Sequence, residues 1–290
     1  MQVAIHFGTH GTEPERMIKT LMDNRDWLLA NGVEVVPPGR CRGVLDEAIN
    51  SLQGGTATPA MEEVLYDALL ENDDVRRMII SQPALIGSPV RCIASRGFFQ
   101  QAGNRMRSVA NLFPDAEVEL SLAIRNPALQ IPWLVERSGA EGLDKIADVD
   151  PLTLRWAPAM RRVIESNPGR RVVVWCYEDT PLIWPECVRR IAQMPPNVPL
   201  KAGLAVLGEL LTPEGMAELR DTLTRTRSLT IEARRDIFAD MLARHVRMDQ
   251  VQAHADIPGW TQDLVDEITE AYEADVAEIA ALPGVEFIGP

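Results

Sequence analysis

Short apolar runs, each separated from the next by a longer segment, recur along the first 180 residues of the chain. The runs predict strands over residues 2–7, 33–37, 78–81, 118–124 and 171–177. Runs with little polar alternation are typical of strands that are buried on both faces. Helical patterns fall between them, and strands alternating with helices indicate a parallel sheet covered on both sides, with right-handed crossovers. We therefore predict a three-layer α/β fold with a mostly parallel sheet of about five strands.

Helical spacing dominates the rest of the chain. We predict helices up to residue 30 and over residues 60–73, 105–113, 152–167, 182–193, 213–227, 230–247 and 260–281, with an edge strand at 285–288. Asn31-Gly32 is a left-handed helix stop. The last helix carries its apolar residues on one face and its acids on the other, which favours a packed helix over a protein-binding arm. The prediction is one domain, residues 1–290, with a core over 1–193 and a mainly helical part over 194–290.

The net charge of −13 is concentrated near the C-terminus. Residues 249–290 hold ten acidic residues and no Lys or Arg, which leaves −13 + 10 = −3 for residues 1–248. Duplex nucleic acid is therefore not an expected partner, because its binding depends on neutralising phosphates, whereas a small anionic ligand far from the acidic segment stays possible.

Four widely spaced cysteines form no CxxC pair, so they predict reduced, buried thiols rather than a zinc site or a disulfide framework. No apolar run approaches the roughly 20 residues needed to cross a bilayer. The first residues lack a charged segment and a long apolar stretch. No membrane association and a cytoplasmic location are expected.

Ligands of open parallel sheets bind beyond the carboxyl ends of the strands. Four predicted loops qualify: 8–15, 82–97, 125–133 and 178–185. The first opens a helix, whose backbone N–H groups and dipole suit an anion. That loop has neither a Walker A lysine nor a GxGxxG pattern, which argues against ATP hydrolysis and Rossmann-type NAD binding.

Three segments carry a resemblance to a known family. They are Ile5-His6-Phe7-Gly8-Thr9-His10-Gly11-Thr12, Leu112-Phe113-Pro114-Asp115-Ala116 with the later Arg125-Asn126-Pro127, and Tyr272-Glu273-Ala274-Asp275. Together they resemble the sulfotransferase family, whose P-loop-type fold binds 3′-phosphoadenosine 5′-phosphosulfate. The resemblance implies sulfuryl transfer from that cofactor to a hydroxyl or amine on a small-molecule or carbohydrate acceptor, with no metal.

The resemblance also implies roles for particular residues. The 5′ end of the cofactor would lie on the loop of Gly8, Thr9, His10, Gly11 and Thr12, and its 3′-phosphate on Arg125. His10 and Glu178 would be the catalytic residues, with Glu178 as the base.

The chain departs from the family pattern at several positions: Gly11 replaces the loop lysine, Glu13-Pro14-Glu15 replaces Gly-Thr-Thr, and Trp133 stands where a serine is usual. Sulfuryl transfer needs positive charge and preorganised donors at the leaving phosphate.

The replacement residues have a physical interpretation of their own. Thr12-Glu13-Pro14-Glu15 is a T-x-x-E pattern, which predicts a capping box in which Thr12 and Glu15 occupy the first amides of the helix. Pro14 removes one further donor. This arrangement predicts a turn that does not bind phosphosulfate in the usual way, and therefore an inactive binding or scaffold protein as the alternative to an enzyme.

Other chemistry-bearing residues have two interpretations each. His6 and His10, with Glu13, Glu15, Glu178 and Asp179, are candidates for a metal site and metal-assisted hydrolysis, although a strand histidine is more often a buried, satisfied one.

Asp179 or Thr180 is a candidate helix cap beside Glu178, and Arg125 is expected either to bind an anion or to pair with Glu178 and Asp179. Arg96, Arg105 and Arg107 predict a solvated basic surface.

Overall fold

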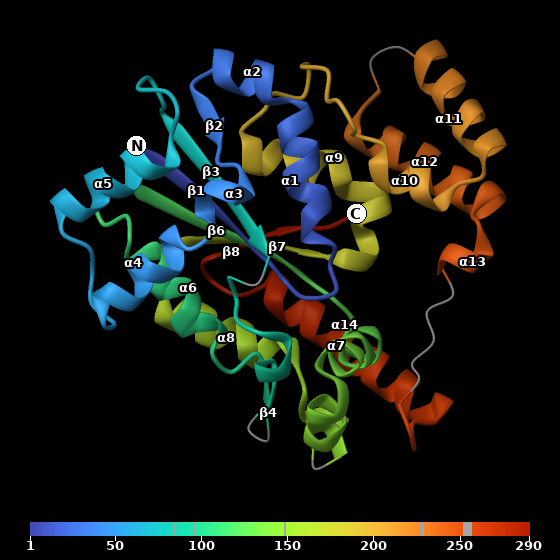
Figure 1. Cartoon of the computed structure of the whole chain (residues 1–290). Coiled ribbons are helices and arrows are strands. Elements are labelled where there is room, and N and C mark those ends of the chain that lie inside the picture. Colours follow the sequence, from blue (N-terminus) through green and yellow to red (C-terminus); the bar gives the residue numbers. More distant parts are fainter. Residues whose placement is uncertain (84, 95–96, 148, 227–228, 252–256) are drawn as a thin grey trace.

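A six-stranded, wholly parallel sheet forms the centre of the computed structural model, with its strands in the order β2-β3-β1-β6-β7-β8 (Figure 1). The structure describes all residues except 84, 95–96, 148, 227–228 and 252–256. The strands are β1 (Gln2–Gly8), β2 (Val33–Val35), β3 (Arg77–Pro83), β6 (Glu117–Ile124), β7 (Arg171–Cys176) and β8 (Val285–Ile288). The predicted α/β architecture is confirmed, and the predicted edge strand makes the sixth member of the sheet.

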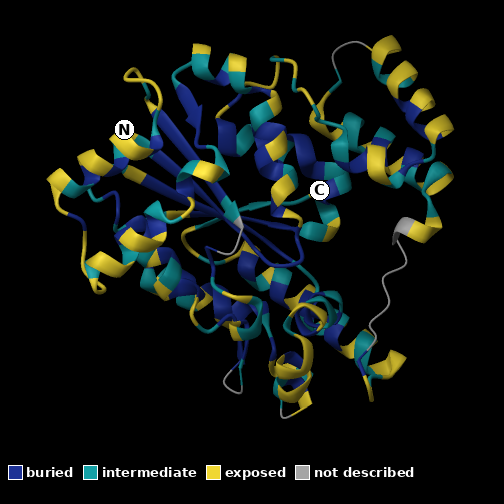
Figure 2. Cartoon of the chain, in the orientation of Figure 1, coloured by how far each residue is buried: buried dark blue, intermediate teal, exposed yellow. Residues whose placement is uncertain are grey.

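Helices cover both faces of this sheet. On one face lie α1 (Pro14–Asp23), α2 (Arg25–Ala30), α9 (Thr180–Ala192) and α10 (Ala205–Leu210). On the other lie α4 (Val44–Leu52), α5 (Pro59–Leu69), α6 (Ala102–Ala110), α7 (Pro127–Ala147), α8 (Trp156–Ser166) and α14 (Gln262–Ala280). Figure 2 shows the buried residues concentrated in the sheet and on the inward sides of these helices.

The strand residues explain the two layers. Side chains alternate across a strand, so Val3, Ile5 and Phe7 of β1 enter one apolar cluster while Ala4 enters the other. All four are buried, because a parallel strand in the middle of the sheet has helices on both sides. The continuous apolar pattern of the sequence is thus a direct result of the double cover.

Smaller elements complete the chain. They are α3 (Pro38–Cys41), η1 (Pro89–Arg91), β4 (Ile93–Ala94), β5 (Gly97–Phe98), η2 (Pro151–Thr153), η3 (Tyr177–Asp179), α11 (Pro213–Arg225), α12 (Ile231–His245) and α13 (Met248–Val251). Strands β4 and β5 form a separate antiparallel pair. Helices α10, α11 and α12 share a third apolar cluster at one end of the molecule (Figure 1).

The predicted extents of the first helix and of two loops are wrong. The first helix does not run unbroken to Ala30, because the Asn24 side chain donates to Thr20 O and Lys201 O and the chain starts a second helix there. Segment 125–133 is not a loop, since α7 begins at Pro127, where a proline is well suited to the first helical turn. The helical start places Trp133 and Arg137 one turn apart on the same side of α7. Segment 178–185 is not a loop either, because η3 leads directly into α9 there.

The last helix differs from its predicted division into an apolar and an acidic face. Asp275 is 1% exposed and accepts hydrogen bonds from the Arg155 guanidinium and from the Trp156 N–H at 2.7 Å. Its carboxylate therefore holds the start of α8 against α14. Ile268, Tyr272 and Ile279 are buried on this helix, as predicted for a packed element.

The four cysteines are buried free thiols, as predicted. None of the helices in the described part of the chain is both long enough and apolar enough to cross a membrane.

Candidate functional site

Strands β1 and β6 are neighbours whose outgoing connections separate at the carboxyl edge of the sheet. The chain leaves β1 for the β2 side, whereas it leaves β6 for β7 on the opposite side. Such a divergence opens a crevice at the ends of the two strands. The turn after Gly8 and the segment after Ile124 meet there, so the sheet order itself brings the loop of the predicted cofactor site beside Arg125.

The turn after β1 is held through its carbonyl groups. Thr9 O accepts from the N–H and the hydroxyl of Thr12, the latter at 2.7 Å. His10 O accepts from Gln130 Nε2 at 2.7 Å, and Gly11 O accepts from Arg125 Nη1 at 2.7 Å. These bonds fix the shape of the turn from within the protein.

Gly11 is required at its position in this turn. Its φ is +78°, a backbone conformation that side chains with a Cβ disfavour. A Cβ at this position would also lie 2.9 Å from Arg125 Nη1 and 3.4 Å from the Trp133 ring. The absence of a Cβ at Gly11 therefore allows Arg125 to approach the backbone closely.

Arg125 is a structural support of the turn in this geometry. Besides its bond to Gly11 O, its guanidinium lies 5.2 Å from the centre of the Tyr177 ring. The expectation that it pairs with Glu178 or Asp179 is not met, since neither carboxylate lies within ion-pair distance of it. Its Nε is buried and has no hydrogen-bond partner in the described residues.

The predicted capping box is wrong. Helix α1 begins at Pro14, so Glu13 is the N-cap residue, and it adopts the left-handed conformation with φ of 48°. No side chain caps the helix, because the Thr12 hydroxyl turns back to Thr9 O. Within the described chain the N–H groups of Gly11, Glu13 and Glu15 have no acceptor. The amides are open, contrary to the prediction that side chains occupy them.

The Glu13 carboxylate contacts side chains outside the turn instead of capping the helix. Its carboxylate accepts from the Tyr177 hydroxyl at 2.9 Å and pairs with Arg16, which also pairs with Glu209. Burial, and next the neighbouring Glu13 charge, raise the pKa of Tyr177 to about 12.

His10 lies on a cavity of about 560 Å³ at this edge. Its ring stacks on Trp133, with 6.1 Å between ring centres, and Arg137 lies over the Trp133 ring at 5.3 Å. The Nε2 atom is 2.8 Å from Gly87 O. Burial lowers the pKa of His10, although the bond to Gly87 opposes this, so the ring is neutral near pH 7.

The hydrogen bond of His10 settles its tautomer. Because a carbonyl oxygen only accepts, Nε2 carries the proton and Nδ1 has a free lone pair, which has no partner in the described chain. The cavity around it is lined by two carboxylates, Glu13 and Glu15, against one guanidinium, Arg137. With His10 neutral, the balance of formal charge on the lining is negative.

Glu178 lines a second cavity, of about 380 Å³, together with Arg125 and Tyr177. Its Oε1 accepts from the Asn126 N–H at 2.8 Å and its Oε2 from the Tyr272 hydroxyl at 3.1 Å. Desolvation of this carboxyl end raises the pKa of Glu178, although the residue as a whole is exposed. Asp179 stands at the N-cap of α9, but neither it nor Thr180 caps the helix through its side chain.

His6 and His10 do not converge. The imidazole of His6 is 3% exposed, bonds Ser81 Oγ at 2.9 Å and stacks on Trp175, so it is a satisfied core side chain. Burial lowers its pKa to about 4. In the described residues no group of three or more His, Cys, Asp or Glu side chains has the arrangement of a metal site.

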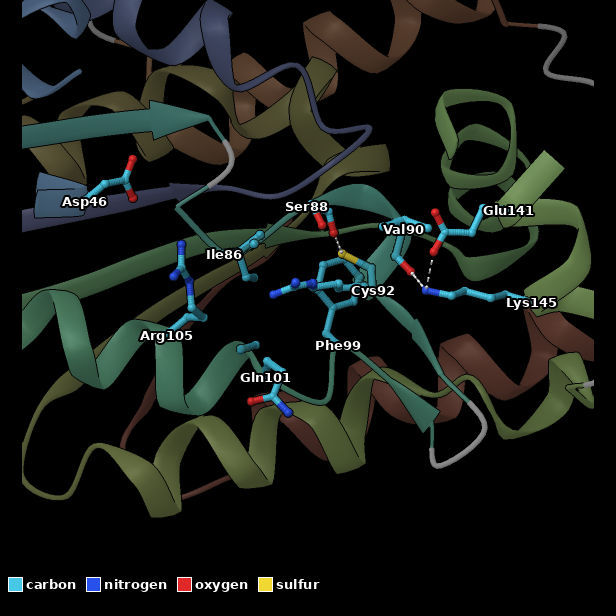
Figure 3. Close-up of a pocket in the computed structure, with 13 residues that line it drawn as sticks. Asp46, Ile86, Ser88, Val90, Cys92, Phe99, Gln101, Arg105, Glu141 and Lys145 are labelled. Atoms are coloured by element: carbon cyan, nitrogen blue, oxygen red, sulfur yellow. Dashed lines mark hydrogen bonds and ion pairs between the residues drawn. The ribbon is translucent and has the colours of Figure 1, made fainter. Parts of the chain in front are cut away.

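A third cavity, of about 780 Å³, is lined in part by residues of the predicted ligand loop 82–97, but no site residue was predicted there. It lies between the segment after β3, the start of α6 and the second half of α7 (Figure 3). Arg105 lines it, although the sequence predicted a solvated surface for Arg105; Arg107 is exposed as predicted, and Arg96 lies outside the described residues. The missed signal is the position of Arg105, one turn before the buried Val109 on the inward side of α6.

The structure thus assembles the predicted cofactor loop and Arg125, but it divides the two predicted catalytic residues between different cavities. Gly8, His10 and Gly11 line the first cavity, whereas Arg125 and Glu178 line the second. Thr9 and Thr12 are buried within the turn and line neither. Comparisons with family models, curated proteins and solved structures gave no match for this chain.

Proposed function

We propose that this protein binds a small ligand on a sulfotransferase-like α/β fold and does not transfer a sulfuryl group. One observation carries the proposal: within the described residues His10 and Glu178 line different cavities, which have Glu13 in common, and the His10 cavity is lined by one guanidinium against two carboxylates. Transfer from a phosphosulfate requires cations and donors around a polyanionic leaving group. A negatively lined cavity works against that requirement even though the amides of the turn are open.

The surroundings of Glu178 support the same conclusion. A general base must reach the proton that it removes. Both oxygens of Glu178 already accept hydrogen bonds from Asn126 and Tyr272, and the carboxyl group joins the start of α7 to α14. These two hydrogen bonds give Glu178 a structural role and leave neither carboxylate oxygen unbonded.

Titration with 3′-phosphoadenosine 5′-phosphate, followed by thermal unfolding and calorimetry, tests the proposal. A ligand at 100 times its dissociation constant stabilises the folded state by about 2.7 kcal/mol, so binding at the turn is readily detected. For the unaltered protein we expect no binding of the nucleotide at the turn, that is, no shift that depends on Gly11 and Arg125, and no sulfonation of hydroxyl or amine acceptors supplied with the phosphosulfate donor. A concentration-dependent shift together with transfer of sulfate to an acceptor would refute the proposal.

The double variant Glu13→Gln, Glu15→Gln provides the matched comparison. If the negative lining excludes the nucleotide, removing both carboxylates leaves the open amides of the turn and the nucleotide binds more tightly to the variant than to the parent. Equal absence of binding in both proteins would show that the charge of the lining is not the reason.

Sulfuryl transfer is the second candidate function, and the free Nδ1 of His10 favours it. A neutral imidazole with an unused lone pair, facing a cavity, is suited to accept a proton from an acceptor hydroxyl. If the sulfonation assay is positive, His10→Gln is expected to abolish the activity while Glu178→Gln retains it.

A further inference from the structure

The 780 Å³ cavity differs from the other two in the charge of its lining. Three cations line it, Arg91, Arg105 and Lys145, against two carboxylates, Asp46 and Glu141. This is the reverse of the balance around His10. Its volume lies within the range of roughly 300–1,000 Å³ that is usual for small-ligand sites.

One end of this cavity is internally neutralised. Lys145 Nζ donates to Val90 O at 2.7 Å and pairs with Glu141 at 3.4 Å (Figure 3). The charge of Lys145 is thus balanced by groups on its own α7 and on η1.

The opposite end is not neutralised. In the described part of the chain the side chain of Arg105 at this end forms no hydrogen bond and no ion pair, and its Nε is shielded from solvent without a partner. Arg91, elsewhere on the lining, has no side-chain partner within the described residues either. Asp46 lies at the same end in Figure 3, yet it does not come within ion-pair distance of Arg105. A buried donor without an acceptor is costly, and an incoming anion would supply the acceptor.

The middle of the cavity is apolar. Ile86, Cys92 and Phe99 are each almost fully buried, and their side chains lie between the two charged ends (Figure 3). The Cys92 thiol bonds the Ser88 carbonyl, and burial raises its pKa to about 12, so it acts as an apolar wall.

We propose that this cavity is a binding site for a small organic anion, whose acidic group is held by Arg105, whose apolar body packs on Phe99 and Ile86, and whose charge is also attracted by Arg91 on the cavity lining. The planar guanidinium fork matches a carboxylate, sulfonate or phosphate group. The site rests on the proposed binding function and deepens it, because it names the class of ligand and places it in a different cavity from the one that His10 lines.

Calorimetry with naphthalene-2-sulfonate tests the site, with naphthalene-2-sulfonamide as the neutral compound of the same shape. The sulfonate is expected to bind at least about tenfold more tightly than the sulfonamide, as for one charge-assisted hydrogen bond. Equal binding of the two compounds, or no binding of the sulfonate at millimolar concentration, would overturn the proposal.

Variants then locate the binding. Arg105→Met keeps the length of the side chain and is expected to weaken binding of the sulfonate about tenfold or more. Arg107→Met is the control, because Arg107 is exposed on the same helix, bonds Asn104 and does not line the cavity. It is expected to change the affinity less than twofold.

Arg91→Met is a second test of the cavity in case the Arg105 variant does not fold. Arg91 is exposed, so its replacement leaves the core intact. It is expected to weaken binding several-fold. Unchanged affinity in both cavity variants would refute the site. The two proposals fail separately: sulfonation by the intact protein refutes the binding-only function, whereas loss of the Arg105 dependence refutes the anion site alone.

Discussion

The buried His6 makes the stability of this protein depend on pH in a window where few other groups titrate. Its pKa in the folded protein is about 4, below the 6.5 of an exposed imidazole, because the ring is buried, in contact with Ser81 and Trp175. The unfolded chain therefore binds a proton more readily than the folded chain. Stability from this residue is complete above pH 6.5 and is lost as the pH falls toward 4.

The expected size follows from the two pKa values. Linkage between a pKa of 6.5 and one of about 4 gives a loss of about 2 kcal/mol from His6 between pH 7 and pH 5. This is a large share of the roughly 5–15 kcal/mol typical of folded proteins.

Urea unfolding at pH 7 and pH 5, with the parent and His6→Gln compared, measures this contribution. The glutamine keeps a polar partner for Ser81 and has no proton to gain, so the loss between the two pH values is expected to be about 2 kcal/mol smaller in the variant. His10 shares the lowered pKa, and His10→Gln separates its part. The same pH dependence in His6→Gln and parent would refute the assigned burial of the ring.

Three further outcomes are expected. Gly11→Ala destabilises the fold by roughly 2–4 kcal/mol in urea unfolding, because the alanine is strained at positive φ and displaces Arg125 from Gly11 O; a loss below 1 kcal/mol would contradict this. Asp275→Ala costs about 2–4 kcal/mol in the same assay, since the Trp156 N–H and Arg155 lose their acceptor, and an unchanged midpoint would count against it. All four cysteines react with a thiol reagent only after unfolding, as buried thiols stay protonated; rapid native labelling would disagree.

The layers of the fold were predictable from the sequence because they follow from apolar periodicity. A continuous apolar run, such as that of β7, predicts a strand that is covered on both faces in the interior of a sheet. Segment 125–133 was predicted as a loop, and it contains two prolines, at positions 127 and 132, which are frequent in loops. Pro127 instead starts the helix. At that position a backbone N–H would have no acceptor within the helix, so the proline costs no hydrogen bond.

The candidate site was predictable only in its location. Residues after the ends of β1 and β6 had to meet once the strands were placed, which brought Gly11 and Arg125 together. The direction of each side chain depends on tertiary contacts that no local pattern encodes. Thr12 had the spacing of a capping residue, yet its hydroxyl binds Thr9 O because the left-handed Glu13 moves the helix start by one residue.

The environment of Arg105 also depends on tertiary contacts that the local sequence does not encode. Its sequence neighbours suggested a solvated surface, whereas the chain folds the segment after β3 over it.

The pairing of β8 with β7 has a consequence for synthesis on the ribosome. Residues 177–284 separate the two strands. The backbone groups on the outer edge of β7, a strand with a run of valines, therefore have no β8 to pair with until that whole stretch has been synthesised. An apolar strand with free backbone groups is a template for association with other chains. We expect nascent chains halted before residue 285 to be the species most prone to aggregate and most dependent on chaperones.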